Sequence, residues 1–221
     1  MGVAVKICGL RTPEGIAAAV EGGARFVGFV FYRRSPRYVS PAEARELARR
    51  VPEGVAKVGV FVNPGDPELE AARACLDMIQ LHGAESPERV AMIRARFARP
   101  VIKAIKLAIE ADLEPVAAFA EVADWLMFDA KAPAALDDAL PGGNARAFDW
   151  RLLARKDAGG GRPWLLSGGL TPGNVAEAIA IAGAEAVDVS SGVETRPGVK
   201  SVERIRAFLD AVAGRPASDT V

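Results

Sequence analysis

Short apolar runs alternate along the chain with longer segments whose apolar residues have helical spacing. The runs are mostly continuous in apolar character, which is typical of strands that are covered on both faces in a parallel sheet. They predict eight strands, at Val3–Ile7, Phe26–Phe31, Ala56–Val62, Met78–Leu81, Val101–Ile105, Trp125–Phe128, Trp164–Leu166 and Ala186–Val189. A segment with room for one helix follows each run.

Five of the intervening segments open with a helix start signal. A side chain that can accept a hydrogen bond stands at the N-cap, and proline follows at N1, where its missing N–H has no cost. These pairs are Thr12-Pro13, Ser40-Pro41, Asp66-Pro67, Ser86-Pro87 and Thr171-Pro172. Glu43 completes a capping box with Ser40, and Gly22-Gly23 and Gly183 supply C-terminal stops.

One strand and one helix in every roughly 25–30 residues, repeated eight times, is the composition of a minimal (β/α)8 TIM barrel. The alternative is an open, doubly wound sheet. The number of strands and the lack of an early Gly-x-Gly-x-x-Gly turn favour the barrel. No linker interrupts the 221 residues. We therefore predict an α/β protein with one (β/α)8 domain over residues 1–213 and a flexible, polar tail over 214–221.

Composition limits the function classes. Lys+Arg and Asp+Glu both total 28, and no basic stripe is present, so we expect no nucleic-acid partner. The chain has no apolar run of about 18 residues and no signal-peptide pattern near Met1, which predicts a cytoplasmic protein without membrane contact. Two cysteines are too few for a disulfide framework, and a single histidine argues against His-rich zinc sites. We expect neither a metal nor an organic cofactor.

The active site of a TIM barrel lies at the C-terminal ends of its strands, so reactive residues at those ends are the candidates. Cys8 stands at the end of the first strand, either as a small buried core residue or as a thiolate base. Asp129 follows the sixth strand. It either caps a loop or, as a carboxyl group withdrawn from water, stays protonated and serves as a general acid.

Two further polar residues stand at predicted strand ends. The loop after the second strand carries three arginines, among them Arg37. Such residues are either solvated surface or a bidentate clamp for a substrate carboxylate. His82 follows the fourth strand and is either a hydrogen-bonded structural residue or a member of the site.

Glycine-rich turns follow the seventh and eighth strands. The first contains Gly168 and Gly169, and the second contains Ser190, Ser191 and Gly192. TIM barrels commonly bind phosphate at these two positions, because glycines let backbone amides approach the anion closely. The pair of turns favours a phosphate site over two structural turns. The residues alone therefore suggest proton transfer on a small sugar phosphate.

The sequence also resembles a known family in blocks that run from the first strand to the last helix. The blocks are Lys6-Ile7-Cys8-Gly9, Ser35-Pro36-Arg37, Val58-Gly59-Val60-Phe61, Ile79-Gln80-Leu81-His82-Gly83, Phe148-Asp149-Trp150, Gly168-Gly169-Leu170, Val187 to Glu194, and Pro197-Gly198-Val199-Lys200. They are similar to the signature blocks of phosphoribosylanthranilate isomerases. The combination of the Cys-Gly block with Val-Asp-Val-Ser-Ser-Gly-Val-Glu is specific, and the resemblance covers nearly the whole chain.

This resemblance implies an Amadori rearrangement of N-(5-phosphoribosyl)anthranilate to the 1-deoxyribulose phosphate, a step of tryptophan biosynthesis. It implies that Asp129 is the general acid and Cys8 the general base. The remaining substrate contacts that we expect are Arg37, which would hold the anthranilate carboxylate, and His82, Gly168, Gly169, Asp188, Ser190, Ser191 and Gly192.

One block departs from the family pattern, since residues 142–147 read Gly-Gly-Asn-Ala-Arg-Ala where the family usually has Gly-Gly-Thr-Gly-Lys-Thr. The departure puts loop closure and substrate affinity in question. The alternatives are another phosphate-binding barrel of tryptophan or histidine biosynthesis, and a non-catalytic binding protein. We expect a monomer or a homodimer. The sequence leaves open whether a second aminoaldose phosphate is also a substrate.

Overall fold

The computed structural model describes residues 2–131, 147–154 and 157–214 of the chain. Eight parallel strands close into a barrel in the order β1 to β8, with β1 paired to both β2 and β8. The strands are β1 (Ala4–Cys8), β2 (Phe26–Val30), β3 (Ala56–Phe61), β4 (Met78–Leu81), β5 (Val101–Leu107), β6 (Trp125–Ala130), β7 (Trp164–Leu166) and β8 (Ala186–Val189). The predicted (β/α)8 barrel is confirmed.

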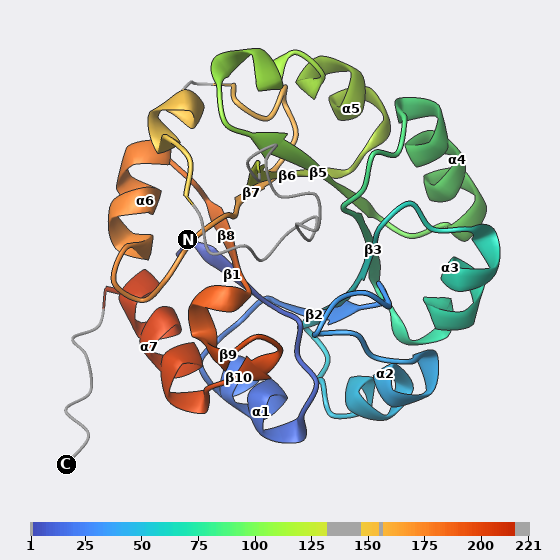
Figure 1. The fold of residues 1–221 in the computed structure, drawn as a ribbon, viewed down its shortest axis with the longest axis vertical. Helices are drawn as coiled ribbons and strands as arrows, with labels where there is room; N and C mark the ends of the chain where they lie inside the picture. Colours follow the sequence, from blue (N-terminus) through green and yellow to red (C-terminus); the bar gives the residue numbers. More distant parts are fainter. Residues whose placement is uncertain (1, 132–146, 155–156, 215–221) are drawn as a thin grey trace.

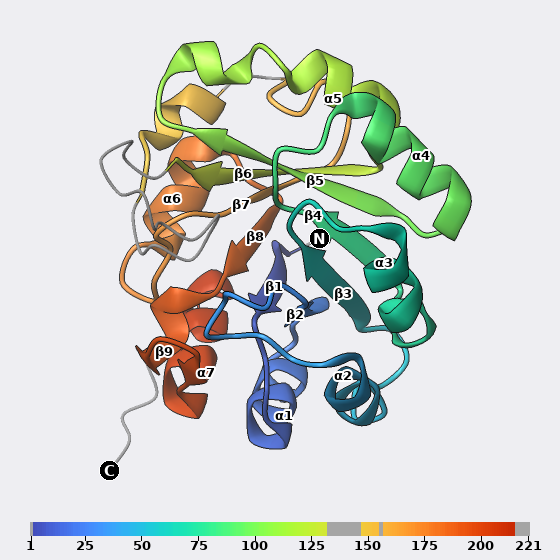
Figure 2. The same cartoon turned by 45° about the vertical axis from the view of Figure 1, so that its right-hand side comes forward.

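Seven α-helices in the described part of the chain surround the strands (Figure 1). They are α1 (Pro13–Glu21), α2 (Pro41–Ala48), α3 (Asp66–Ala72), α4 (Pro87–Phe97), α5 (Val116–Val122), α6 (Val175–Ala182) and α7 (Val202–Val212). Short 3₁₀ segments are η1 (Arg73–Cys75), η2 (Glu110–Leu113), η3 (Trp150–Leu153) and η4 (Ser191–Val193), and β9 (Glu194–Arg196) pairs with β10 (Val199–Lys200) in a small hairpin. Figure 2 shows the helices around the outside of the strands from a second direction.

Three of the five predicted caps are present at helix starts. Thr12, Ser40 and Ser86 each accept a backbone N–H at the start of α1, α2 and α4. Ser40 and Glu43 form the predicted capping box, and Gly183 ends α6 in the left-handed conformation. The predicted helix starts are therefore confirmed at these three positions.

Two predicted helix starts were wrong. Gly65, not Asp66, is the N-cap of α3. α6 begins at Val175 rather than after Thr171, because the Asn174 side chain accepts the Thr171 N–H and closes a separate turn first. Between β6 and β7 the described residues contain η3 and no α-helix. Residues 142–146 of the atypical block and 215–221 of the predicted tail lie outside the described residues.

The barrel interior is filled in layers by side chains that alternate along the strands. The lowest layer is apolar and includes Phe26, Val58, Met78, Ile102, Met127 and Leu165. Two residues further along β1, β4 and β8, the same face carries Lys6, Gln80 and Asp188, all almost fully buried. The next inward positions, Cys8 and His82, lie at the mouth of the barrel. The alternation thus stacks a polar layer directly beneath the predicted site.

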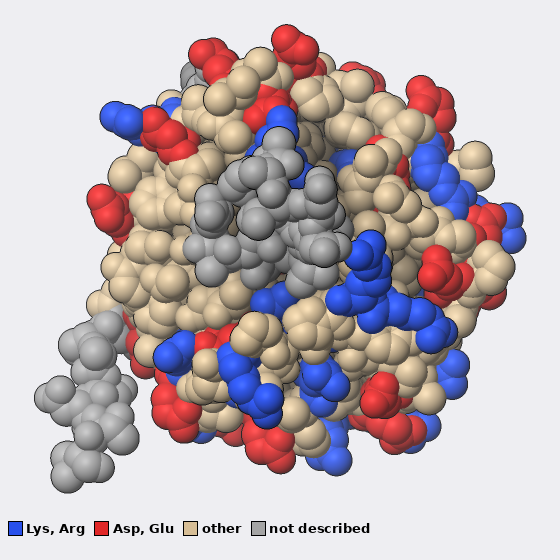
Figure 3. All heavy atoms as spheres, viewed as in Figure 1, with Lys and Arg blue, Asp and Glu red and all other residues tan. Residues whose placement is uncertain are grey.

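Acidic and basic side chains are interspersed around the edge of the face seen in Figure 3, as the equal numbers of the two charges suggest. Within the described residues, no helix has both the length and the apolar character needed to cross a membrane.

Candidate active site

A pocket opens at the C-terminal ends of the barrel strands. Nine of the ten predicted site residues line it, namely Cys8, Arg37, His82, Asp129, Gly168, Gly169, Asp188, Ser190 and Ser191. Gly192 lies next to them in η4. The sequence-predicted residues are therefore brought together at one site.

Cys8 is the last residue of β1 and is only 6% exposed. It packs against Val30 and Val60 on the inner wall of the barrel. This burial raises the pKa of the Cys8 thiol above its ordinary value, whereas the nearby charges of Lys6 and Lys200 act in the opposite direction. Nearby positive charge is therefore present, but burial outweighs its effect on the pKa of the thiol.

An ion pair fills the interior beneath Cys8. Lys6 and Asp188 are register partners on β1 and β8, and Lys6 Nζ lies 2.7 Å from Asp188 Oδ1. The Ser167 hydroxyl donates to Asp188 Oδ2 at 3.1 Å. Burial alone would lower the pKa of Lys6, but the charges of Asp188 and Cys8 raise it above its ordinary value. Lys6 is therefore an ammonium inside the barrel.

Asp129 belongs to β6, which extends two residues beyond its predicted end, so the aspartate is a strand residue and not a loop cap. His82 Nε2 lies 2.9 Å from Asp129 Oδ2. The Gln80 side-chain nitrogen lies 2.9 Å from His82 Nδ1 and 3.3 Å from the Met127 sulfur. With Gln80 Nε2 as the donor, Nδ1 accepts and Nε2 carries the ring proton that it donates to Asp129, while Gln80 Oε1 is buried and has no hydrogen-bond partner among the described residues. Three buried side chains thus fix the orientation of the carboxyl group.

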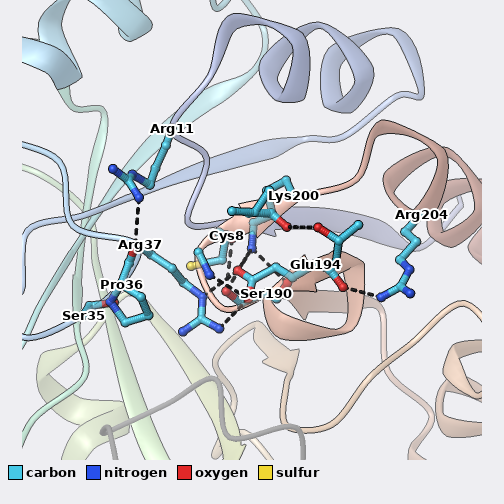
Figure 4. A network of polar contacts seen from close by, with 12 residues as sticks. Cys8, Arg11, Ser35, Pro36, Arg37, Ser190, Glu194, Lys200 and Arg204 are labelled. Atoms are coloured by element: carbon cyan, nitrogen blue, oxygen red, sulfur yellow. Dashed lines mark hydrogen bonds and ion pairs between the residues drawn. The ribbon is translucent and has the colours of Figure 1, made fainter.

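Arg37 lies in the loop after β2 and is buried, which argues against the surface interpretation of this arginine. Its Nε and Nη2 donate to the two carboxylate oxygens of Glu194 at 2.7 and 2.8 Å. Figure 4 shows Arg37 and Lys200 converging on Glu194 beside Cys8 and Ser190. Among the described residues no hydrogen bond to Nη1 is seen, and Arg37 lines the pocket, so a substrate carboxylate would meet the edge of the guanidinium that Glu194 leaves open.

Glu194 is the centre of this network. Burial would raise its pKa, but the hydrogen bond from Arg37 and the charge of Lys200 bring it below the ordinary value. Lys200 Nζ also donates to the Ser190 carbonyl at 2.9 Å, and the Ser190 hydroxyl donates to the Cys8 carbonyl at 3.2 Å. The network therefore holds Arg37 and the turn after β8 in fixed positions relative to β1.

The two glycine-rich turns lie against each other. Gly168 and Gly169 both have positive φ, at 86° and 67°, a conformation that favours glycine. A Cβ on Gly168 would lie 2.5 Å from the Ala130 nitrogen, and one on Gly192 would lie 1.9 Å from the Leu170 oxygen. Side chains are excluded at both positions, which keeps backbone exposed where a phosphate would have to approach closely.

Comparison with known proteins matches this arrangement to one family. A family model described as "N-(5'phosphoribosyl)anthranilate (PRA) isomerase" matches residues 5–211. The N-(5'-phosphoribosyl)anthranilate isomerase of Paracoccus denitrificans (strain Pd 1222) is 57% identical over 211 residues, which cover 95% of this chain and 96% of the relative. That of Rhodospirillum centenum (strain ATCC 51521 / SW) is 55% identical over 215 residues, covering 96% and 99%.

Solved structures agree. The crystal structure of phosphoribosyl anthranilate isomerase from Thermotoga maritima has a TM-score of 0.84 and 40% identity, and the match covers 96% of this chain and 99% of that one. A second isomerase structure, in complex with reduced 1-(o-carboxyphenylamino)-1-deoxyribulose 5-phosphate, has a TM-score of 0.82 and 38% identity with the same coverage. The chain belongs to the N-(5'-phosphoribosyl)anthranilate isomerase family.

Membership of this isomerase family confirms the resemblance seen in the sequence blocks, and the chain is an enzyme of the isomerase class. Sequence reasoning assigned no role to several polar residues of the site: Lys6, Gln80, Glu194 and Lys200. The first two could have been found, because each stands two positions before a predicted site residue on the same strand face. Glu194 lies 157 residues from Arg37 in the sequence, and no local sequence pattern predicts their contact.

Proposed function

We propose that this chain catalyses the Amadori rearrangement of N-(5-phosphoribosyl)anthranilate to 1-(2-carboxyphenylamino)-1-deoxyribulose 5-phosphate, in tryptophan biosynthesis. Asp129 is the general acid and Cys8 the general base. The observation that carries these roles is that the carboxyl group and the thiol line one pocket whose rim includes both glycine-rich turns. Family membership supports the reaction itself.

The acid step opens the ribose ring. His82 donates to Asp129 Oδ2, so the transferable proton sits on Oδ1. Asp129 gives this proton to the ring oxygen while the C1–O bond breaks, and the nitrogen lone pair forms the C1=N bond of a cationic Schiff base. The hydrogen bond from His82 then stabilises the carboxylate that the transfer leaves behind.

The base step moves the proton of C2. The Cys8 thiolate takes it, and the C–H electron pair forms the C1=C2 double bond while the C1=N pair returns to nitrogen, which gives a neutral enolamine. Tautomerisation then gives the ketone. Because the cationic Schiff base acidifies C2, a modest base is sufficient. In this mechanism protons and charges balance because Asp129 starts protonated and Cys8 starts as the thiolate.

Binding contacts lie at two separate parts of the pocket. Arg37 would hold the anthranilate carboxylate through Nη1, since Glu194 occupies its other edge. Backbone amides of Gly168, Gly169, Ser191 and Gly192 would hold the phosphate, and Ser190 and Asp188 would support the wall beside them. Anchoring both ends of the substrate leaves the sugar carbons between the acid and the base, which lowers the entropic part of the barrier.

The decisive experiment supplies phosphoribosylanthranilate, made enzymatically in situ, to the purified protein and follows the ketose product by mass spectrometry. We expect turnover by the wild type. Cys8→Ala and Asp129→Asn should each reduce kcat by about 10²–10⁴, because each removes one proton-transfer partner. Cys75→Ala is the matched control, since Cys75 is outside the pocket and donates to the Ala72 carbonyl.

Near-normal turnover in either site variant would refute the role of that residue. Binding without turnover by the wild type would instead favour a non-catalytic binding protein. The oligomeric state stays a prediction. One similar structure, with a TM-score of 0.81, is described as monomers generated from the dimeric isomerase of Thermotoga maritima, and light scattering of this chain would distinguish a monomer from a homodimer.

A further inference from the structure

A charged amine is buried directly beneath the thiol that the proposed mechanism uses as its base. Lys6 has 0% of its surface exposed, and Asp188 holds its Nζ at 2.7 Å. An ammonium group is costly to bury, and one opposite charge offsets that cost only in part. An apolar pair would fill the same space at lower cost. The presence of this pair beneath Cys8 therefore calls for a functional reason.

Gly28, on β2, shows how the thiol and the amine lie relative to each other. A Cβ at this position would lie 3.1 Å from Cys8 Sγ and 3.2 Å from Lys6 Nζ. Both atoms border the same small volume, which a single methyl group would fill. The glycine thus leaves no side chain in the space that borders both atoms, and the sulfur and the ammonium are close enough for their charges to interact strongly in a buried site.

We propose that Lys6 is a positioning residue whose ammonium group stabilises the thiolate form of Cys8 and so prepares the base for the C2 proton. This inference rests on the proposed function, which makes Cys8 the base. Lys6 keeps its own proton throughout, since Asp188 stabilises it as a cation. The thiolate formed above the ammonium completes an ion triplet of Asp188, Lys6 and Cys8.

Other charged groups surround the thiol, and each acts in a definite direction. Lys200, on β10, assists Lys6, while Asp188 opposes both. The coupling is reciprocal, because the charge of Cys8 raises the pKa of Lys6 as the charge of Lys6 lowers the pKa of Cys8. The remaining titratable or charged side chains that line the same pocket are Tyr32, Arg37, His82 and Asp129.

The test measures the ionisation of the thiol without any substrate. In a Cys75→Ala background Cys8 is the only cysteine, and its alkylation by iodoacetamide is followed by mass spectrometry as a function of pH. Lys6→Met keeps the length of the side chain and removes the charge. We expect its alkylation midpoint to move to higher pH, with a rate at least about tenfold lower at pH 8, because the thiolate loses its counter-charge.

Two further variants separate charge from packing. Lys6→Arg keeps the charge and should retain most of the alkylation rate. The double variant Lys6→Met/Asp188→Asn removes the unpaired carboxylate that could destabilise the single variant, and it should still show the raised midpoint. Melting curves check that each variant is folded.

An unchanged midpoint in the folded Lys6→Met or double variant would overturn the inference, as would equal alkylation rates in Lys6→Arg and Lys6→Met. Because alkylation needs no isomerase chemistry, this failure is distinct from failure of the proposed function. Full turnover by Cys8→Ala would show that Cys8 is not the base, whatever the alkylation experiment shows about the ionisation of its thiol.

Discussion

The side of the pocket that carries Cys8 is built from buried ion pairs, whereas the side that carries Asp129 is built from a chain of hydrogen bonds through an amide and an imidazole. On β1 and β8 the thiol stands above the Lys6–Asp188 ion pair, and the Arg37–Glu194 pair lies close by. On β4 and β6 the Gln80 amide is hydrogen-bonded to the imidazole of His82, and this imidazole is hydrogen-bonded to the Asp129 carboxyl group. A general base needs its anion stabilised, while a general acid needs its proton held in one place. The two sides match the base and acid roles that we propose for Cys8 and Asp129.

The largest effect on binding should come from the charged side. Arg37→Ala removes the guanidinium that faces the pocket, and we expect KM to rise by about 10–100-fold, the value of one or two charge-assisted hydrogen bonds. Steady-state kinetics measures this change. Arg33→Ala, an exposed arginine of the same loop, is the matched control and should leave KM near its normal value. An unchanged KM in Arg37→Ala would contradict the clamp.

A smaller effect, on kcat, should come from the neutral side. Gln80→Leu removes the donor to His82 Nδ1, so the imidazole can place its proton on either nitrogen. We expect kcat to fall about tenfold with little change in KM, because Asp129 loses its fixed donor. Since His82 is the only histidine, ¹⁵N labelling of histidine gives one imidazole whose tautomer NMR reads directly.

Met127→Leu is the control for this experiment, because it removes only the sulfur contact of the Gln80 amide. It should keep the Nε2–H tautomer that the wild type shows. If NMR showed the wild-type His82 imidazole protonated on Nδ1, the hydrogen-bond chain described for the Asp129 side of the pocket would be wrong. An equal loss of kcat in Met127→Leu would show that packing, and not the hydrogen bond to His82, is what matters.

The smallest effect is on stability and appears at alkaline pH. The pKa of Lys6 is raised above 10.5 in the folded state. The stabilisation from its charge is therefore fully present below pH 10.5 and is lost as the pH rises through the folded-state value. We expect the difference in unfolding free energy between wild type and Lys6→Met/Asp188→Asn to change above pH 10.5, by at most about 1.4 kcal/mol per pH unit. Denaturant unfolding at several pH values measures it. A difference that is constant across this range would contradict a charged Lys6.

The sequence predicts the barrel well because its signals are local. Apolar runs, proline at N1 and an acceptor at the N-cap each depend on a few neighbouring residues, and they locate every strand and three of the five predicted helix starts. Thr171-Pro172 failed, since the Asn174 side chain accepts the Thr171 N–H in a separate turn and α6 begins only at Val175. Where two local sequence signals for a helix start are equally strong, the sequence alone does not show which of them the folded chain uses.

The site residues were predicted from their places at strand ends, but their partners were not. Interpreting the strands as continuous apolar runs hid the alternation that puts Lys6 beneath Cys8 and Gln80 beneath His82. The contact of Arg37 with Glu194 joins two distant loops, and only the closed barrel brings them together. This contact also changes the interpretation of Arg37, since half of its guanidinium already binds a carboxylate within the protein.

The pairing of β1 with β8 has a consequence for how the enzyme comes into being. Lys6 and Asp188 are 182 positions apart in the sequence, yet they are register partners in the closed barrel. Without β8, Lys6 would lie at the barrel axis without its counter-ion, and a buried charge that lacks its partner is strongly destabilising. Closure of the ring by β8 therefore also supplies the carboxylate that the buried lysine needs.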